Sequence, residues 1–269
     1  MEGATITTIA ATSSSPSPST ATAAVAPTLL VYFHGNAGNV GHRLAIAKEF
    51  LNDASNPVDV LMVDYRGYGL SDAVRPCEVG LQLDAAAVMD YVDRKVSVMK
   101  QKVIVMGVSL GGAVALYLAS HRKYRQMMDG LILENTFVGI SEMGDAMLAP
   151  MINHKYGKDS CGGKVLSAIL RYFIKPLVIQ IHWRSIDRIP QVGVPILFLS
   201  GLKDELVPPS HMKKLFENAI RAPFKRFVAF ETGKHNDLCG KDGFFGQVGK
   251  FVDYVSSTNS ATATAAEVK

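Results

Sequence analysis

The chain has 269 residues, of which 48% are hydrophobic and 19% are charged. This share of apolar residues can form the core of one large domain or two small ones, so the composition excludes a wholly disordered protein. The net charge of +4 comes without a dense run of Lys and Arg, which excludes the basic surface typical of nucleic-acid binding. Its three cysteines are widely spaced and form no Cys-x-x-Cys pair, so the sequence indicates neither a disulfide framework nor a metal site.

Both ends of the chain are biased in composition. Residues 1–27 form a low-complexity segment rich in Ser and Pro, with one β-branched stretch, Thr5–Ala10, that can form a strand. Residues 256–269 form an Ala/Thr/Ser tail that we expect to be disordered. No apolar run reaches the roughly 18 residues of a spanning helix, and no signal-peptide pattern is present. We therefore expect a cytoplasmic or peripheral membrane protein, for which contact with a membrane surface stays open.

Short apolar runs without polar alternation predict strands that are buried on both faces, as in a parallel sheet. The predicted strands are residues 28–33, 58–63, 103–106, 131–133, 196–199 and 226–230. Helical patterns lie between several of them, at residues 42–51, 83–95, 111–120, 210–220 and 244–255. This alternation predicts an α/β fold with a mostly parallel, doubly wound sheet and right-handed crossovers.

The segment 139–188 interrupts the alternation. It contains no strand-like run and is rich in Met, Ile, Leu and aromatic residues. Ligands of α/β folds bind beyond the carboxyl ends of the strands, so an insertion after a strand is expected to lie over the site. We therefore predict a helical cap at about residues 139–188, with an ordinary extra helix pair as the alternative.

The run Gly107-Val108-Ser109-Leu110-Gly111 fits the pattern Gly-x-Ser-x-Gly between a predicted strand and a predicted helix. In that setting the pattern is typical of a nucleophile elbow. The turn strains the backbone at Ser109, and side chains at Gly107 and Gly111 would clash with it. The alternative is a serine that caps a helix in a glycine-rich turn.

A serine hydroxyl is a poor nucleophile unless a base takes its proton. His235 lies just beyond the last predicted strand, and Asp204 follows the strand before it. Both should therefore lie at the same edge of the sheet as Ser109. An acid is needed to orient the histidine and to stabilise its cation, and the chain order Ser, Asp, His is that of α/β-hydrolases.

Three other acidic residues are alternatives to Asp204. We expect Glu205 to face away from the histidine, Asp237 to cap a turn or the next helix, and Glu134 to anchor its own turn. Asp204 is therefore the preferred acid.

The loop after the first long predicted strand is the candidate for the oxyanion hole. Its position predicts that the backbone N–H groups of Asn36 and Leu110 together bind the developing negative charge. Gly35 lets the loop approach the substrate, and we expect His34 to hold the loop by hydrogen bonds.

Six segments occur in order between about Thr28 and Val255: FHGNAGNVGHR, VDYRGYGLS, GVSLGG, ENTF, SGLKDELVPP and GKHND. Together they resemble the α/β-hydrolases and, more narrowly, the α/β-hydrolase-domain-containing protein 13 group. The resemblance implies an α/β-hydrolase domain over residues 28–255, with Ser109, Asp204 and His235 as a triad. It also implies hydrolysis of an ester or thioester without a metal or organic cofactor. Relatives usually carry a membrane anchor and two strands before the first segment, so we expect the first strand to be missing here.

The combined interpretation is a serine hydrolase that forms an acyl-enzyme on Ser109. The apolar cap favours lipid esters and acyl-protein thioesters, so the expected partner is a small-molecule or acylated-protein substrate. A serine peptidase of the same fold is the alternative enzyme. A catalytically silent scaffold and a membrane adaptor that acts through the cap are the alternatives without catalysis.

Overall fold

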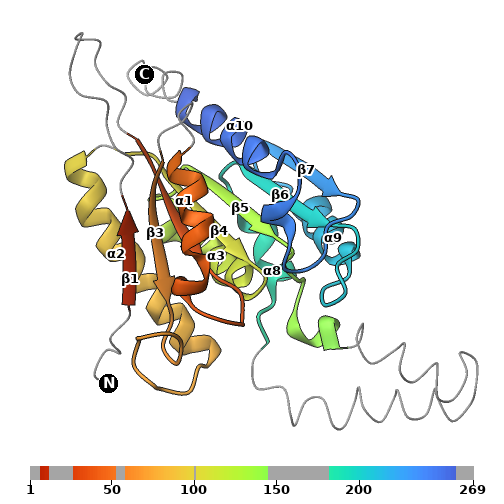
Figure 1. Ribbon diagram of the computed structural model, residues 1–269, viewed down its shortest axis with the longest axis horizontal. Coiled ribbons are helices and arrows are strands. Elements are labelled where there is room, and N and C mark those ends of the chain that lie inside the picture. Colours follow the sequence, from red (N-terminus) through yellow and green to blue (C-terminus); the bar gives the residue numbers. More distant parts are fainter. Residues whose placement is uncertain (1–6, 12–26, 53–57, 100, 145–181, 259–269) are drawn as a thin grey trace, which may run out of the picture.

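The computed structural model describes residues 7–11, 27–52, 58–99, 101–144 and 182–258. Within these residues one seven-stranded sheet has the order β1-β3-β2-β4-β5-β6-β7 (Figure 1). β1 is antiparallel to β3, and all other neighbouring pairs are parallel. The strands are β1 (Thr7–Ala11), β2 (Thr28–Phe33), β3 (Val58–Asp64), β4 (Val103–Val108), β5 (Gly130–Glu134), β6 (Ile196–Gly201) and β7 (Lys225–Phe230). The mostly parallel α/β sheet predicted from the apolar runs is confirmed.

The edge strand β1 overlaps the strand predicted at Thr5–Ala10. It pairs along β3 from Thr7 opposite Asp64 to Ala11 opposite Val60. The next strands, β2 to β5, are buried along nearly their whole length, as expected of strands covered by helices on both faces.

Helices cover both faces of this sheet. The helical elements are η1 (Val40–Arg43), α1 (Leu44–Asn52), α2 (Glu78–Met99), α3 (Leu110–Ser120), α4 (Arg122–Arg125), α8 (Ser185–Arg188), η3 (Ile189–Gln191), α9 (Pro209–Asn218), η4 (Leu238–Gly240) and α10 (Phe244–Ser257). Helices α1 and α10 pack on one face, while α2, α3 and α9 pack on the other (Figure 1). The part of the chain that is described holds no helix with the length and apolar character needed to cross a bilayer.

Helix α2 begins earlier than the apolar pattern predicts. Its first turn starts at Glu78, and Val79 is 65% exposed. Leu81 in this turn is nevertheless buried in the core, so the apolar pattern that begins near Leu83 misses the first core contact of the helix. The side chain of Glu78 accepts hydrogen bonds from the backbone N–H groups of His182 and Trp183. These contacts tie the start of α2 to the segment that leads into α8.

Only the two ends of the predicted cap belong to the described residues. Residues 140–144 are helical, and α8 follows at the other end. Between them, residues 145–181 lie outside the described part of the chain, so the predicted cap stays a prediction. Trp183 is fully buried in the core on the α2–α3 face of the sheet.

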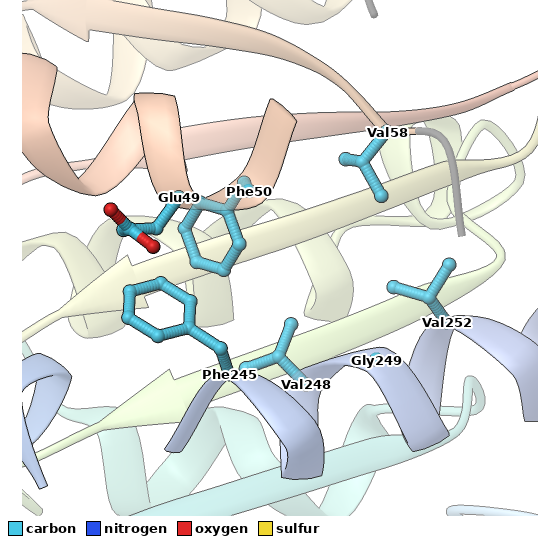
Figure 2. A pocket seen from close by; sticks show the side chains of 7 residues that line it. All are labelled: Glu49, Phe50, Val58, Phe245, Val248, Gly249 and Val252. Carbon is cyan, nitrogen blue, oxygen red and sulfur yellow. The ribbon is translucent and has the colours of Figure 1, made fainter. Parts of the chain in front are cut away.

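A small apolar pocket opens between α1 and α10 (Figure 2). It is lined by Phe50 of α1 and by Phe245, Val248 and Val252 of α10. The centroids of the two phenyl rings are 5.2 Å apart, and the rings meet edge to face. Its free volume of ≈ 10 Å³ is comparable to a single water molecule. A pocket of this size is too small for an acyl group, so it is not the substrate site.

Candidate active site

Ser109 lies in a strained turn between β4 and α3. Its φ of 52° and ψ of −113° fall in a region that non-glycine residues rarely adopt. A Cβ atom on Gly107 would overlap the backbone of Gly111, and one on Gly111 would overlap the carbonyl oxygen of Phe33. The two glycines therefore allow the close packing of strand, turn and helix that holds Ser109 in this conformation.

Replacement of Gly111 by alanine is expected to destabilise the fold by about 3 kcal/mol or more, because the clash is with backbone that cannot move aside. The measurement is the free energy of unfolding in urea. Gly246→Ala in α10 is the matched control, since it also lies in the first turns of a helix but its Cβ would meet nothing within 4 Å. The control should be neutral or slightly stabilising. Equal effects of the two changes would contradict the packing argument.

His235 lies between Ser109 and Asp204, at the carboxyl edge of the sheet. Its Nε2 atom is 3.1 Å from Ser109 Oγ, and its Nδ1 atom is 2.8 Å from Asp204 Oδ2. His235 and Asp204 are buried, whereas Ser109 is partly exposed. The carboxylate of Asp204 favours a proton on Nδ1, which leaves the lone pair of Nε2 directed at the serine hydroxyl. The structure thus brings together the three residues that the sequence predicts.

Asp204 is itself held in place by its own loop. The backbone N–H groups of Leu206 and Val207 donate to Asp204 Oδ1 at 2.9 and 2.8 Å. These bonds occupy one carboxylate oxygen and leave the other for His235. Hydrogen bonds of this kind stabilise the charged form of a carboxyl group.

The other acidic candidates do not contact the imidazole. Asp237 accepts a hydrogen bond from the backbone N–H of Lys234 and pairs with Lys241. Glu205 is exposed and does not contact the ring, although its carboxylate accepts a long hydrogen bond of 3.4 Å from the backbone N–H of His235. Asp204, and not Glu205, is therefore the acid beside the imidazole.

Glu134 is the last residue of β5, and it is buried on the face of the sheet that α1 and α10 cover. Strand alternation places it with Ile132 in the core beneath α1 and α10. The expectation that it anchors its own turn is wrong, since its carboxyl group makes no hydrogen bond within the described residues. Burial raises the pKa of Glu134 to about 8, and Arg43 opposes this shift.

This burial predicts a pH-dependent stability that Glu134→Gln removes. The folded chain keeps the proton up to about pH 8, whereas the unfolded chain loses it near 4.5, so stability falls as pH rises between these values. The free energy of unfolding of Glu134→Gln relative to wild type should therefore grow by roughly 1 kcal/mol per pH unit from about pH 5 to about pH 8. Urea unfolding across this range measures it. The exposed Glu217→Gln is the control, and parallel curves for Glu134→Gln and wild type would contradict the argument.

The loop that follows β2 lies beside Ser109. A Cβ atom on Gly35 would be 3.5 Å from Ser109 Cβ, which is an ordinary van der Waals distance, so the loop passes directly beside the serine. Buried His34 donates from Nδ1 to the carbonyl oxygen of Gly35 at 2.6 Å, and Tyr65 donates its hydroxyl to the carbonyl oxygen of His34 at 2.9 Å. Burial lowers the pKa of His34, and the carboxylate of Asp64, which lies 3.1 Å from His34 Nε2, opposes this shift.

The outer part of the same loop is held by side chains. The hydroxyl of Tyr68 donates to Asn36 Oδ1 at 2.7 Å, and Arg43 donates to the carbonyl oxygen of Ala37 at 3.3 Å. Leu110 is the first residue of α3, where a backbone N–H has no partner within the helix. The loop and the helix start thus flank Ser109 with the two residues proposed for the oxyanion hole.

Among the described residues, no three His, Cys, Asp or Glu side chains are grouped closely enough to hold a metal ion. The site described above offers a serine hydroxyl, an imidazole, a carboxylate and backbone N–H groups. Such an arrangement can activate a hydroxyl for attack on a carbonyl carbon.

A family model for the alpha/beta hydrolase fold matches residues 28–158. Two curated relatives are more than 35% identical to this chain over most of its length. The sheet order and the turn at Ser109 have the geometry expected of that fold. The chain belongs to the α/β-hydrolase family.

The chain is 38% identical over 227 residues to protein bem46 of Schizosaccharomyces pombe. The aligned residues make up 84% of this chain and 67% of that protein. It is 37% identical over 212 residues to the alpha/beta hydrolase domain-containing protein WAV2 of Arabidopsis thaliana, covering 78% and 64%. The chain therefore spans about two thirds of the length of these curated relatives. The esterase EaEST from Exiguobacterium antarcticum shares the fold, with a TM-score of 0.60 at 21% identity over 95% of this chain and 97% of that one.

Proposed function

We propose that this protein is a serine hydrolase that cleaves carboxylic esters or thioesters through an acyl-enzyme on Ser109. The observation that carries the proposal is the hydrogen-bonded series from Ser109 through His235 to Asp204, built on a strained turn. A serine that serves only as a helix cap needs no histidine and no backbone strain. In addition, the side chain of Ser109 makes no capping hydrogen bond to α3.

In the first half-reaction, Ser109 Oγ attacks the carbonyl carbon of the substrate while its proton passes to His235 Nε2. Asp204 stabilises the resulting imidazolium, and the backbone N–H groups of Asn36 and Leu110 bind the oxyanion. His235 then donates the proton to the departing alcohol or thiol, which leaves an acyl group on Ser109. In the second half-reaction, His235 takes a proton from water while the water oxygen attacks the acyl carbon. The bond from this carbon to Ser109 Oγ then breaks, His235 returns the proton to Oγ, and the acid leaves.

An apolar acyl group is the favoured part of the substrate. Leu202 and Leu206 flank Asp204 in the same loop and are 47% and 41% exposed. Exposed leucines beside a reactive centre support contact with acyl chains rather than with charged peptides. We therefore propose lipid esters or acyl-protein thioesters as the substrate class.

The test compares acetyl, octanoyl and palmitoyl esters of p-nitrophenol, a palmitoyl thioester and a peptide p-nitroanilide. The proposal predicts turnover of esters and thioester, with the longer acyl groups preferred, and little cleavage of the anilide. Cleavage of the anilide in preference to the esters would support the peptidase alternative. No turnover of any substrate by folded protein would contradict the proposal and favour the scaffold.

A further inference from the structure

Asn135, the residue that follows β5, uses its side chain to join three separate parts of the fold. Its Nδ2 group donates to the carbonyl oxygens of Lys234 at 3.0 Å and His235 at 3.1 Å. Its Oδ1 atom accepts from the backbone N–H of Gly201 at 2.9 Å. Asn135 is only 1% exposed, so these hydrogen bonds take the place of hydrogen bonds to water.

The three partners of Asn135 lie on the two loops that carry the acid and the base. Gly201 ends β6 just before the loop of Asp204, and Lys234 and His235 lie in the loop after β7. The two loops also contact each other directly, because Lys203 donates its N–H to the carbonyl oxygen of Gly233 at 2.9 Å. The amide of Asn135 thus fixes the loop of His235 against the end of the strand that leads to Asp204.

The backbone of Asn135 suits this residue type. Its φ of 43° lies in the left-handed region, which asparagine adopts more readily than most residues. Asp cannot donate the two hydrogen bonds, and an apolar side chain would leave two buried carbonyl groups and one N–H without partners. Glycine could adopt the backbone conformation but has no side chain to join the loops.

The next residue, Thr136, holds the nucleophile side of the site. Its hydroxyl donates to the carbonyl oxygen of Ser109 at 2.7 Å, and its side chain packs against Gly112 of α3. The two residues after β5 therefore contact the segments that carry all three members of the proposed triad.

We infer that Asn135 is a positioning residue that sets the distances among Ser109, His235 and Asp204, with Thr136 as its counterpart at the nucleophile. This inference rests on the proposed function. Within the described residues, the side chain of Asn135 bonds to backbone groups alone, so it is given no part in proton transfer. Its effect is to hold His235 where Nε2 reaches Ser109 Oγ while Nδ1 reaches Asp204 Oδ2.

The test is the ester kinetics of Asn135→Gly, which keeps the backbone conformation and removes the three bonds. Asn135→Asp, which places an oxygen against the two carbonyl groups, is the second variant, and Asn52→Gly at the exposed end of α1 is the matched control. We expect kcat per folded molecule to fall about 10²-fold in Asn135→Gly, because a misplacement near 1 Å costs that much, while KM changes only a few-fold. The acidic limb of the pH profile of kcat/KM should also move to lower pH, because a displaced His235 is stabilised less in its protonated form by Asp204.

A purely structural role would lower the folded fraction without moving the pH profile. An unchanged profile and an unchanged kcat per folded molecule in Asn135→Gly, with active wild type, would overturn the inference and leave the proposed function intact. Inactive wild type would instead contradict the proposed function itself. Thr136→Val, which keeps the shape and loses one hydrogen bond, should reduce kcat less than Asn135→Gly, and a wild-type rate there would overturn the role given to Thr136.

Discussion

Ser109→Ala is expected to lower kcat for ester hydrolysis by about 10⁶-fold, to the residual rate that the backbone donors alone support. The variant has no oxygen with which to form the acyl-enzyme, and His235 has no hydroxyl to activate. Stability should change little, because Ser109 is partly exposed and alanine adopts the strained backbone at similar cost. Initial rates with a chromogenic ester measure the loss.

The control for this change is Ser210→Ala, at an exposed position in the first turn of α9. It should retain the wild-type rate. A Ser109→Ala variant with the activity of the control would show that hydrolysis takes place at another residue.

Asp204→Asn is expected to lower kcat by about 10⁴-fold with little change in KM. The amide of the variant can donate to His235 Nδ1, which shifts the proton of the imidazole to Nε2. In that tautomer Nε2 cannot accept the proton of Ser109 Oγ, although the distances are preserved. The amide oxygen can still accept the N–H groups of Leu206 and Val207, so the loop should keep its conformation.

Glu205→Gln is the matched control, because Glu205 is the neighbouring acid and accepts its hydrogen bond from the backbone N–H of His235 rather than from the ring. It should change kcat by no more than about three-fold, since hydrogen bonds of this kind have small net energies. A larger loss in Glu205→Gln than in Asp204→Asn, measured as kcat for the same ester, would assign the role of the acid to Glu205.

Much of the fold could be predicted from the sequence because parallel strands buried on both faces are continuous apolar runs. The predicted run at residues 58–63 and the observed β3 agree almost residue for residue. The start of α2 could not be predicted in this way, since Glu78 is held by contacts with the distant residues His182 and Trp183 rather than by core packing.

The site residues Ser109, Asp204 and His235 could be located because each lies within a few residues of the end of a strand, and the ends of parallel strands meet. The positions of Glu205 and Glu134 could not be predicted, because they depend on how one loop turns and which face of the sheet a strand end presents. Asn135 gave only a weak signal, an asparagine directly after a buried strand. Its three partners lie far along the chain, so only the structure reveals them.

The central claim, that Ser109 is activated by His235 and Asp204, is tested most directly by reaction of the purified protein with a fluorophosphonate. This reagent phosphonylates a serine only when a neighbouring base activates it. We predict one adduct per chain, located on Ser109 by peptide mass mapping, and its loss in both Ser109→Ala and His235→Ala. Folded wild-type protein that stays unlabelled, or that carries the adduct at another residue, would contradict the account.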